Sequence, residues 1–338
     1  MIIEMEKGAS QKLIDGVVRK VRELGFDVQP NIGEKETVIA VLGSNTGEVD
    51  TQIFETLPGV KKVIRIMSPY KLASRDFSNK KTIVKINGVE IGGSNVVIMA
   101  GPCAVESEEQ ILACAKEVKK LGGQILRGGA FKPRTSPFAF QGLKLEGLKF
   151  LAKARKETGL IVVSEVVSVN DVPLVSEFVD ILQIGARNMQ NYSLLTAVAE
   201  SKKPVLLKRG FAATIEEWLM AADYLLRGNG FNVILCERGV RTFDNSTRFT
   251  LDVGAIPVVK RLSHLPIIVD PSHAAGNFRY VPVLARAATA AGADGLIIEI
   301  HPDPQNALSD GAQSLTFSDF ARLIGEIRII AEAIGRKI

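Results

Sequence analysis

The chain has 338 residues, of which 46% are hydrophobic, 23% charged and 6% aromatic, and it carries a formal net charge of +5. Because the basic residues are dispersed and aromatic residues are few, this composition favours anionic small molecules as ligands and argues against nucleic acid. The three cysteines predict a reducing, cytoplasmic environment without a disulfide framework, and the lack of an apolar run of roughly 18 residues argues against a membrane protein.

The first 67 residues are predicted to form a small domain of their own. Its expected elements are strands at 1–5, 26–29, 37–42 and 60–67, and helices at 11–24 and 49–57. The order βαββαβ is that of a ferredoxin-like domain. No residue in it has an obvious catalytic partner. By analogy of fold we therefore expect a regulatory module that binds a small effector or a partner subunit.

Residues 68 to 94 are predicted to connect this module to a larger domain. The stretch up to Lys81 is polar and without periodicity, which is typical of a linker. Two short apolar runs then flank Asn87-Gly88, a strong signal for a hairpin with a two-residue turn. A hairpin in this position is suited to closing the bottom of a barrel.

From residue 95 onward, short apolar strands alternate with helical patterns. The eight predicted strands are Val96–Ala100, Gln124–Leu126, Leu160–Ser164, Ile181–Ile184, Val205–Leu207, Val233–Leu235, Ile267–Val269 and Gly295–Ile298. Eight consecutive βα units with nearly continuous apolar strands predict a parallel (β/α)8 TIM barrel over residues 95 to 338. A doubly wound open sheet is the rival fold, but no G-x-G-x-x-G motif opens a first helix.

Cationic residues follow several of these strands. In a parallel barrel the chemistry lies at the carboxyl ends of the strands, so side chains distant in sequence meet at one mouth. The cations expected there are Arg127, Lys132, Arg187, Lys208 and Arg238, and Gln183 shares a strand side with Arg187. Five cations brought together repel one another, so the arrangement predicts a strongly anionic ligand carrying both phosphate and carboxylate.

The loop from Arg127 to Ser136 concentrates further binding groups. Arg134 is able to fork onto phosphate oxygens, and Thr135 and Ser136 add two hydroxyls. Glycines at 128 and 129 allow close approach of a ligand to the backbone, while a proline stiffens the loop. A solvated basic loop is the plainer interpretation, but similar groups recur at the end of nearly every later strand.

A second group has the composition of a metal site. Cys103, His273 and Glu299 follow the first, seventh and eighth strands, and Asp310 lies in the loop after the eighth. The eighth strand adjoins both the first and the seventh in a closed barrel, so the four are able to meet. A thiolate, an imidazole and two carboxylates suit Mn, Fe, Co or Zn. No tight spacing motif accompanies them, and Cys103 is equally compatible with a small buried hydrophobe.

A covalent mechanism is also open at this point. Lys208 ends an apolar strand, where desolvation favours the neutral amine that a Schiff-base aldolase needs. The crowd of neighbouring cations serves anion binding better than it serves a Schiff base.

Taken together, the motifs resemble those of 3-deoxy-D-arabino-heptulosonate 7-phosphate (DAHP) synthase. The matching segments are Gly101-Pro102-Cys103, Arg127-Gly128-Gly129-Ala130, Lys132-Pro133-Arg134-Thr135-Ser136, Gly185-Ala186-Arg187, Lys208-Arg209-Gly210, Cys236-Glu237-Arg238-Gly239, Asp270-Pro271-Ser272-His273 and Ser309-Asp310-Gly311. The resemblance covers residues 95 to 338, and the first domain resembles the ferredoxin-like extension of one variant. It implies a transferase that condenses phosphoenolpyruvate with erythrose 4-phosphate, the entry step of the shikimate pathway.

The resemblance also implies roles for individual residues. Arg127, Lys132, Arg187, Lys208 and Arg238 match the phosphoenolpyruvate site, and Arg134, Thr135 and Ser136 match contacts to the sugar phosphate. Cys103, His273, Glu299 and Asp310 match the metal ligands. The metal would polarise the aldehyde of erythrose 4-phosphate. We expect Lys132 to act as proton donor or electrostatic partner of the alkoxide that forms.

Two other functions remain as alternatives. One is the sister enzyme that makes 3-deoxy-D-manno-octulosonate 8-phosphate from arabinose 5-phosphate, whose corresponding loop resembles Lys-Ala-Asn-Arg-Ser-Ser; Pro133-Arg134-Thr135 departs from it. The other is a non-catalytic sugar-phosphate sensor, which has no need for the metal quartet. The family resemblance further implies a homotetramer, and feedback inhibition by an aromatic amino acid through residues 1 to 67.

Overall fold

The computed structural model describes residues 1–33, 37–43, 45–46, 48–65, 69–132, 136, 138–230 and 232–338. The chain divides into two compact units. The first comprises residues 1–81 together with 262–264, and the second comprises residues 82–261 and 265–338. The domain limits at residues 67 and 94 stay a prediction.

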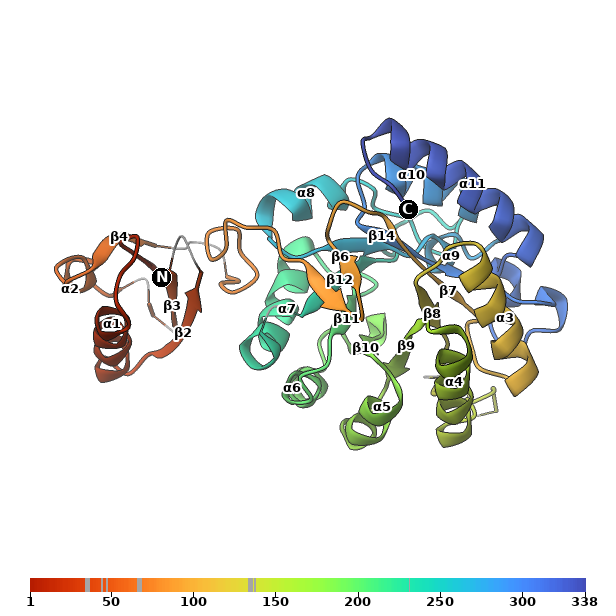
Figure 1. Cartoon of the computed structure of the whole chain (residues 1–338), viewed down its shortest axis with the longest axis horizontal. Coiled ribbons are helices and arrows are strands. Elements are labelled where there is room, and N and C mark those ends of the chain that lie inside the picture. The colour runs from red at the N-terminus through yellow and green to blue at the C-terminus, as the bar shows by residue number, and fades with distance from the viewer. Residues whose placement is uncertain are drawn as a thin grey trace. The chain divides into compact units, whose positions relative to one another are not determined.

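The first unit contains the expected ferredoxin-like domain. Its elements are β1 (Ile2–Met5), α1 (Gln11–Glu23), β2 (Asp27–Ile32), β3 (Thr37–Leu42), α2 (Gln52–Glu55) and β4 (Val60–Ile64). The antiparallel sheet has the order β2-β3-β1-β4 (Figure 1). Helix α1 buries Ile14, Val17 and Val21 in the core of this domain. Three- and four-residue spacing places these side chains on one face of a helix.

Helix α2 is shorter than the predicted 49–57. The helix begins only after Thr51, and the Asp50 carboxylate before it accepts the backbone N–H of Gln52, at 3.0 Å. Pro58 disfavours helical geometry in the residue before it, which ends the helix early.

Residues 69–81, which the sequence indicates as a linker, are folded against their own unit. Leu72 and Phe77 are buried there. His264 is also buried, and one of its ring nitrogens lies 2.7 Å from the carbonyl oxygen of Leu72. Burial lowers the pKa of His264 to about 4, so the ring is neutral near pH 7. His264 is thus a structural residue of this unit.

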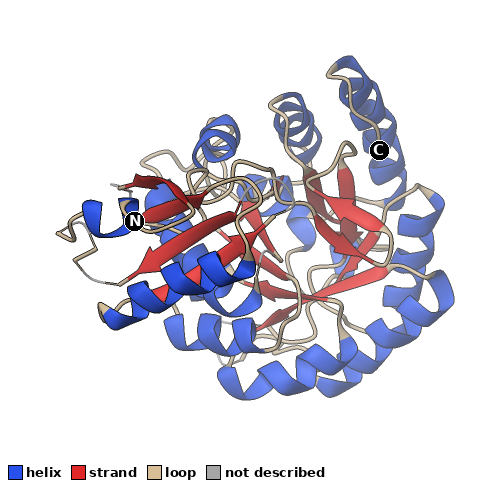
Figure 2. Ribbon diagram, turned by 60° about the vertical axis from the view of Figure 1, so that its left-hand side comes forward, coloured by secondary structure: helices blue, strands red, loops and turns tan. Residues whose placement is uncertain are grey.

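The second unit is the predicted TIM barrel, closed by eight parallel strands. They are β7 (Val97–Gly101), β8 (Ile125–Arg127), β9 (Ile161–Val166), β10 (Ile181–Ile184), β11 (Val205–Lys208), β12 (Val233–Glu237), β13 (Ile267–Val269) and β14 (Gly295–Glu299). The main helices around them are α3 (Glu108–Lys120), α4 (Leu145–Thr158), α5 (Val172–Phe178), α6 (Tyr192–Glu200), α7 (Ile215–Asn229), α8 (Ala255–Leu262), α10 (Val281–Ala290) and α11 (Phe317–Ala333). Figure 2 shows the helices outside the ring of strands.

A hairpin closes the bottom of the barrel, as the sequence predicts. Strands β5 (Val84–Ile86) and β6 (Val89–Ile91) pair in antiparallel register around Asn87 and Gly88. Both turn residues have positive φ, 44° and 84°, which is the geometry of a type I′ turn. Val84, Ile86 and Ile91 join the inward side chains of the barrel in one apolar cluster.

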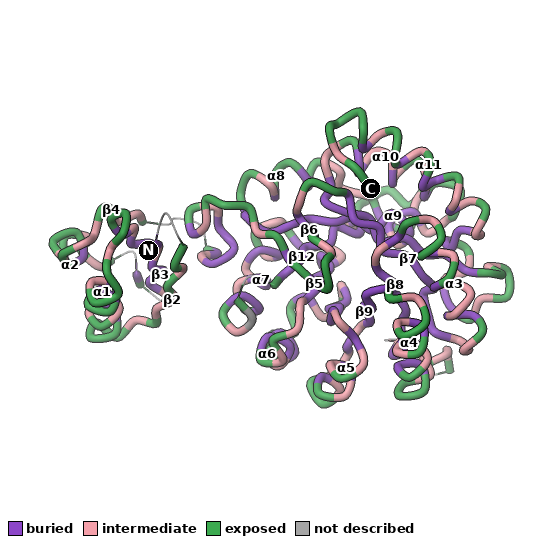
Figure 3. The backbone as a smooth tube through the Cα atoms, in the orientation of Figure 1, coloured by how far each residue is buried: buried purple, intermediate pink, exposed green. Residues whose placement is uncertain are grey.

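The barrel interior is therefore a packed core, and the strands are buried throughout (purple in Figure 3). The opposite end, at the carboxyl ends of the strands, is left for polar groups. None of the helices in the described part of the chain is long and apolar enough to span a bilayer.

Candidate active site

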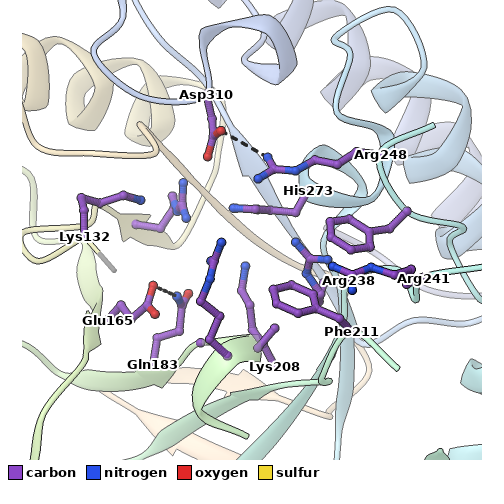
Figure 4. Close-up of a pocket in the computed structure, with 15 residues that line it drawn as sticks. Lys132, Glu165, Gln183, Lys208, Phe211, Arg238, Arg241, Arg248, His273 and Asp310 are labelled. Atoms are coloured by element: carbon purple, nitrogen blue, oxygen red, sulfur yellow. Dashed lines mark hydrogen bonds and ion pairs between the residues drawn. The ribbon is translucent and has the colours of Figure 1, made fainter. Parts of the chain in front are cut away.

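A cavity of about 370 Å³ lies at the mouth of the barrel (Figure 4). Its polar and aromatic lining residues are Arg127, Lys132, Glu165, Gln183, Arg187, Lys208, Phe211, Arg238, Arg241, Arg248, Phe249, His273 and Asp310. Every one of the five predicted cations is among them, because each ends a barrel strand or follows it closely. Seven cations in so small a volume make a strongly positive field that suits an anionic ligand.

The predicted sugar-phosphate contacts are placed less completely. Arg134 and Thr135 lie outside the described residues. Ser136 is described, but it is exposed and does not line the cavity; its hydroxyl accepts the backbone N–H of Phe138, at 3.3 Å. Its assignment as a substrate contact stays a prediction.

Cys103, His273, Glu299 and Asp310 form one compact cluster. One ligand atom from each lies within 4.8 Å of the others. Cys103 Sγ is 3.1 Å from Asp310 Oδ2, and His273 Nε2 is 3.4 Å from Glu299 Oε1. Sulfur, imidazole nitrogen and carboxylate oxygen together are ligands that first-row divalent metals accept. The donor set and its spacing therefore fit such an ion.

Neighbouring side chains hold these four groups in place. Asp270 Oδ2 lies 2.8 Å from Nδ1 of His273 and is also ion-paired with Lys208. A carboxylate on the far ring nitrogen directs Nε2 of the imidazole towards the cluster. The two oxygens of Glu299 are engaged separately, one by Arg127 and the other by the amide nitrogen of Gln313, at 2.6 Å.

The protonation states of the cluster follow from its burial and its charges. Burial raises the pKa of Cys103 to about 11, so the thiol keeps its proton in the free protein. Burial also lowers the pKa of His273, which leaves the imidazole neutral near pH 7. For Asp310, burial alone would raise the pKa, but His273 and Arg248 outweigh it and hold that pKa at about 2. The cluster thus consists of two ionised carboxylates, a neutral imidazole and a thiol, which loses its proton when a cation binds.

The opposite side of the cavity is lined by arginines. The guanidinium carbon of Arg238 lies 4.0 Å from the ring centre of Phe249 and 5.0 Å from that of Phe211. Arg238 is 3% exposed, and one of its terminal nitrogens is buried without a hydrogen-bond partner. A buried guanidinium with a free donor is costly unless a ligand completes it.

Lys132 lies beside the cluster, next to Cys103. Its Nζ is 3.0 Å from the carbonyl oxygen of Cys103 and 2.9 Å from Cys103 Sγ. On the same side of the view as Lys132 in Figure 4, Glu165 accepts a hydrogen bond from the amide of Gln183, at 3.3 Å. Among the described residues that line the cavity, Glu165 and Asp310 are the two carboxylates.

The sequence analysis misses several lining or supporting residues. Arg241, Arg248 and Phe249 belong to the long loop after β12, and Phe211 follows β11. Nη1 of Arg248 lies 3.2 Å from Asp310 Oδ1 and 2.9 Å from Gln313 Oε1. The two arginines could have been predicted from the sequence as anion-binding residues, because they lie in a loop that follows a barrel strand. No sequence pattern indicates a role for the two phenylalanines or for Gln313.

Two family models match the chain. The model described as "DAHP synthetase I family" matches residues 76–332, and the one described as "DAHP synthase ferredoxin-like domain" matches residues 1–68. Among curated proteins, a phospho-2-dehydro-3-deoxyheptonate aldolase of Thermotoga maritima is 45% identical over 338 residues, which is all of both chains. A 2-dehydro-3-deoxyphosphooctonate aldolase of Syntrophotalea carbinolica is 35% identical over 269 residues, covering 73% of this chain and 95% of its own.

Solved structures agree with these matches. The crystal structure of the Thermotoga maritima DAHP synthase superposes with a TM-score of 0.80 at 45% identity, over 99% of this chain and 98% of that one. A truncated form of the same enzyme has a TM-score of 0.74 at 46% identity and covers 79% of this chain and 98% of its own.

Proposed function

Since the chain belongs to the DAHP synthetase I family, we propose that it condenses phosphoenolpyruvate with erythrose 4-phosphate to give DAHP and inorganic phosphate, the first step of the shikimate pathway. The observation that carries this proposal is the placing of a Cys-His-Glu-Asp cluster and an arginine-lined wall around one cavity. The cluster fits a divalent metal, and the wall fits a substrate with phosphate and carboxylate groups.

Phosphoenolpyruvate is held by the cations of the mouth. Arg187 and Arg238 offer forked donors for its phosphate, and Arg127 and Lys208 lie at the strand ends beside them. Arg127 and Lys208 are each paired with a buried carboxylate, which fixes their direction. The ion pair with Asp270 favours a charged Lys208, whereas a Schiff-base aldolase needs a free amine at this position.

The carbon–carbon bond forms between the methylene carbon of phosphoenolpyruvate and the aldehyde carbon of the sugar. Cys103, His273, Glu299 and Asp310 would hold a divalent metal, which would supply Lewis acidity to the aldehyde oxygen. Lys132, next to Cys103, gives its proton to the developing alkoxide. Carbon 2 of the enol phosphate then carries positive charge shared with its oxygen, and we assign Glu165, a carboxylate of the cavity lining, to stabilise it.

Water then adds to that centre, and Glu165 is placed to accept its proton. The resulting hemiketal phosphate loses inorganic phosphate by cleavage of the carbon–oxygen bond, and the carbonyl of DAHP remains. The hemiketal hydroxyl gives its proton to the departing phosphate. One water enters and one phosphate leaves, and the proton that Glu165 takes from water equals in number the one that Lys132 gives, so the site regains its starting state when that proton passes back to Lys132.

The choice of acceptor sugar is assigned to the loop from Lys132 to Ser136. The octulosonate aldolases that match this chain at 30–35% identity are the alternative. They match over 73–75% of the chain, whereas the heptonate aldolase matches over all of it. Competitive turnover of erythrose 4-phosphate and arabinose 5-phosphate tests the choice. Preference for the five-carbon sugar would replace the proposal with its alternative.

Regulation is assigned to the ferredoxin-like domain. Its match to a domain model that carries the name of the synthase supports a role tied to this enzyme. We expect tyrosine or phenylalanine to inhibit the full chain and to leave a form lacking residues 1–67 unaffected. Full-length protein that ignores every aromatic amino acid would remove the assignment. A cytoplasmic homotetramer is the form expected from the family.

One assay tests the central proposal. Release of inorganic phosphate is followed with both substrates, with each alone, and after treatment with a chelator. Turnover should require both substrates, stop on chelation and return with Mn, Fe, Co or Zn. Phosphate release without the sugar, or full activity in the chelated protein, contradicts it.

A further inference from the structure

Two phenylalanines lie at the centre of the arginine-lined wall. The rings of Phe211 and Phe249 are stacked, with centroids 5.2 Å apart and planes 7° from parallel. The guanidinium carbons of Arg187, Arg238 and Arg241 lie 5.4, 5.0 and 5.8 Å from the ring centre of Phe211. Figure 4 shows Arg238 and Arg241 beside Phe211, across the cavity from Lys132.

The local backbone is built to bring the second ring here. In the loop after β12, Val240 and Thr250 pair as a short antiparallel bridge, which returns Phe249 to the strand end. Gly239 has φ +88°, and a Cβ at that position would lie 2.7 Å from Cβ of Phe249. The backbone N–H of Arg241 donates to the carbonyl of Phe211, at 2.6 Å. Only glycine combines this conformation with this contact, so the loop sequence specifies the ring's position.

In the part of the chain that the structure describes, Arg187, Arg238 and Arg241 are not held by salt bridges. No carboxylate of the described residues forms an ion pair with Arg187, Arg238 or Arg241, in contrast to Arg127, which is paired with Glu299. The face of an aromatic ring is negatively polarised and attracts the flat face of a guanidinium. The N–H groups of that guanidinium lie in its plane and therefore stay available to another acceptor. A carboxylate would take those donors and would also repel an incoming anion.

We propose that the Phe211–Phe249 pair is a positioning element for anion binding, in which ring faces hold Arg187, Arg238 and Arg241 together while leaving their N–H donors to a phosphate group. The inference deepens the proposed function and rests on it for the identity of the phosphate donor. Burial lowers the pKa of Arg238 to about 10, so the guanidinium still carries its charge near pH 7 and requires a counter-charge there.

The test uses the full chain and inorganic phosphate as the probe. Phosphate affinity is measured by calorimetry for the wild type and for Phe249→Leu, which keeps apolar bulk but removes the ring. We expect Phe249→Leu to bind phosphate about tenfold more weakly, the scale of a desolvated cation–π contact. Phe249→Tyr keeps a ring of similar electron density and should stay within about twofold of the wild type.

A fluorinated series separates ring electronics from packing. Phenylalanine analogues with one, two and three ring fluorines are incorporated at position 249, where they keep the ring shape and withdraw charge from its face. Phosphate affinity should fall stepwise along the series while the melting temperature stays constant. A flat series overturns the proposal even if Phe249→Leu fails to fold, and so does a wild type that binds no phosphate.

The same measurements distinguish this inference from the proposed function. If affinity falls along the series but no DAHP forms from the two substrates, the positioning role stands and the assigned reaction fails. If DAHP forms and affinity does not follow the ring charge, the reaction stands and the rings are merely packing residues.

Discussion

The two sides of the barrel mouth are built on opposite electrostatic arrangements. On the side of the Cys103, His273, Glu299 and Asp310 cluster, the charged groups are already engaged in ion pairs: Arg127 with Glu299, Lys208 with Asp270, and Arg248 with Asp310. On the side of β10 to β12, Arg187, Arg238 and Arg241 lie against aromatic rings. The first side is nearly neutral and offers ligand atoms to a metal cation. The second keeps its positive charge for an anion.

This difference predicts where function and stability separate. Removing one partner of a buried ion pair leaves the other charge buried and uncompensated, which destabilises the fold. Removing a buried charge that has no ion-pair partner removes such a cost. Residues of the paired side should therefore be required by the fold as well as by the reaction. Arginines of the aromatic side should be required by the reaction alone.

The most severe test of the comparison sets Arg127→Leu against Arg238→Leu. Loss of Arg127 leaves Glu299 buried with one oxygen unpaired, so we expect the free energy of unfolding to fall by about 3–5 kcal/mol. Loss of Arg238 removes a buried donor that has no partner, so stability should be unchanged or higher. Chemical denaturation of both variants measures this, with turnover expected to fall in each. Equal destabilisation would break the comparison.

Cys103→Ser tests the cation side by removing one ligand. Serine keeps the volume but is a poor ligand for a first-row metal, so metal affinity and turnover should fall together by more than about 100-fold, above the usual effect of an outer residue. Cadmium titration by calorimetry is the readout, because the heat of binding reports affinity independently of activity and of the thiolate. Cys114→Ser is the matched control, since that thiol is buried on α3 and is not part of the cluster. An unaltered rate in chelated buffer would contradict the prediction.

The fold was readable from the sequence because each barrel strand is a separate apolar run between polar tips. In the barrel, the predicted strands differ from the observed ones at their ends: β9 continues to Val166 and β12 to Glu237, two residues beyond the predicted limits. Polar residues at a barrel mouth still belong to the hydrogen-bonded ladder, so an apolar pattern ends before the strand does. Helix α2 was overestimated because Asp50 and Pro58 act on its ends and periodicity does not report them.

The site was readable only in part. Arg127, Lys208 and Arg238 were found because a residue at a strand end has a known place in a closed barrel. Arg248 and Phe249 lie more than ten residues beyond the end of β12, and their position depends on how that loop folds back. Hydrophobic periodicity carries no information on such a loop. The metal quartet was recognisable by residue type, but its compactness became visible only with the coordinates.

Gln313→Leu sharpens the comparison from within the paired side. The Gln313 amide donates to Glu299 and accepts from Arg248, so it links a cluster residue with an arginine of the cavity. Leucine keeps the shape but leaves one oxygen of Glu299 free to turn. We expect about tenfold weaker cadmium binding, the usual scale for residues that orient metal ligands. Gln11→Leu on the exposed face of α1 is the control. Unchanged affinity would show that Arg127 alone fixes Glu299.

The smallest expected effect comes from Glu106→Gln, which tests whether the paired side depends on its loops. One oxygen of Glu106 accepts the backbone N–H of Leu308, at 2.9 Å, and the other lies 3.2 Å from Nε2 of His301. Because Nδ1 of His301 accepts the N–H of Asp303, Nε2 carries the proton and donates to Glu106. Glutamine can satisfy one of these donors but faces the other with its own NH₂.

The loop that carries Asp310 should loosen in this variant, and cadmium affinity should fall about fivefold, the equivalent of one hydrogen bond. Phosphate affinity, which depends on the aromatic side, should not change. Glu108→Gln, whose surface ion pair with Lys153 lies outside the mouth, should alter neither. If Glu106→Gln weakened phosphate as much as cadmium, the two sides would be mechanically one, and the electrostatic contrast between them would not divide their functions.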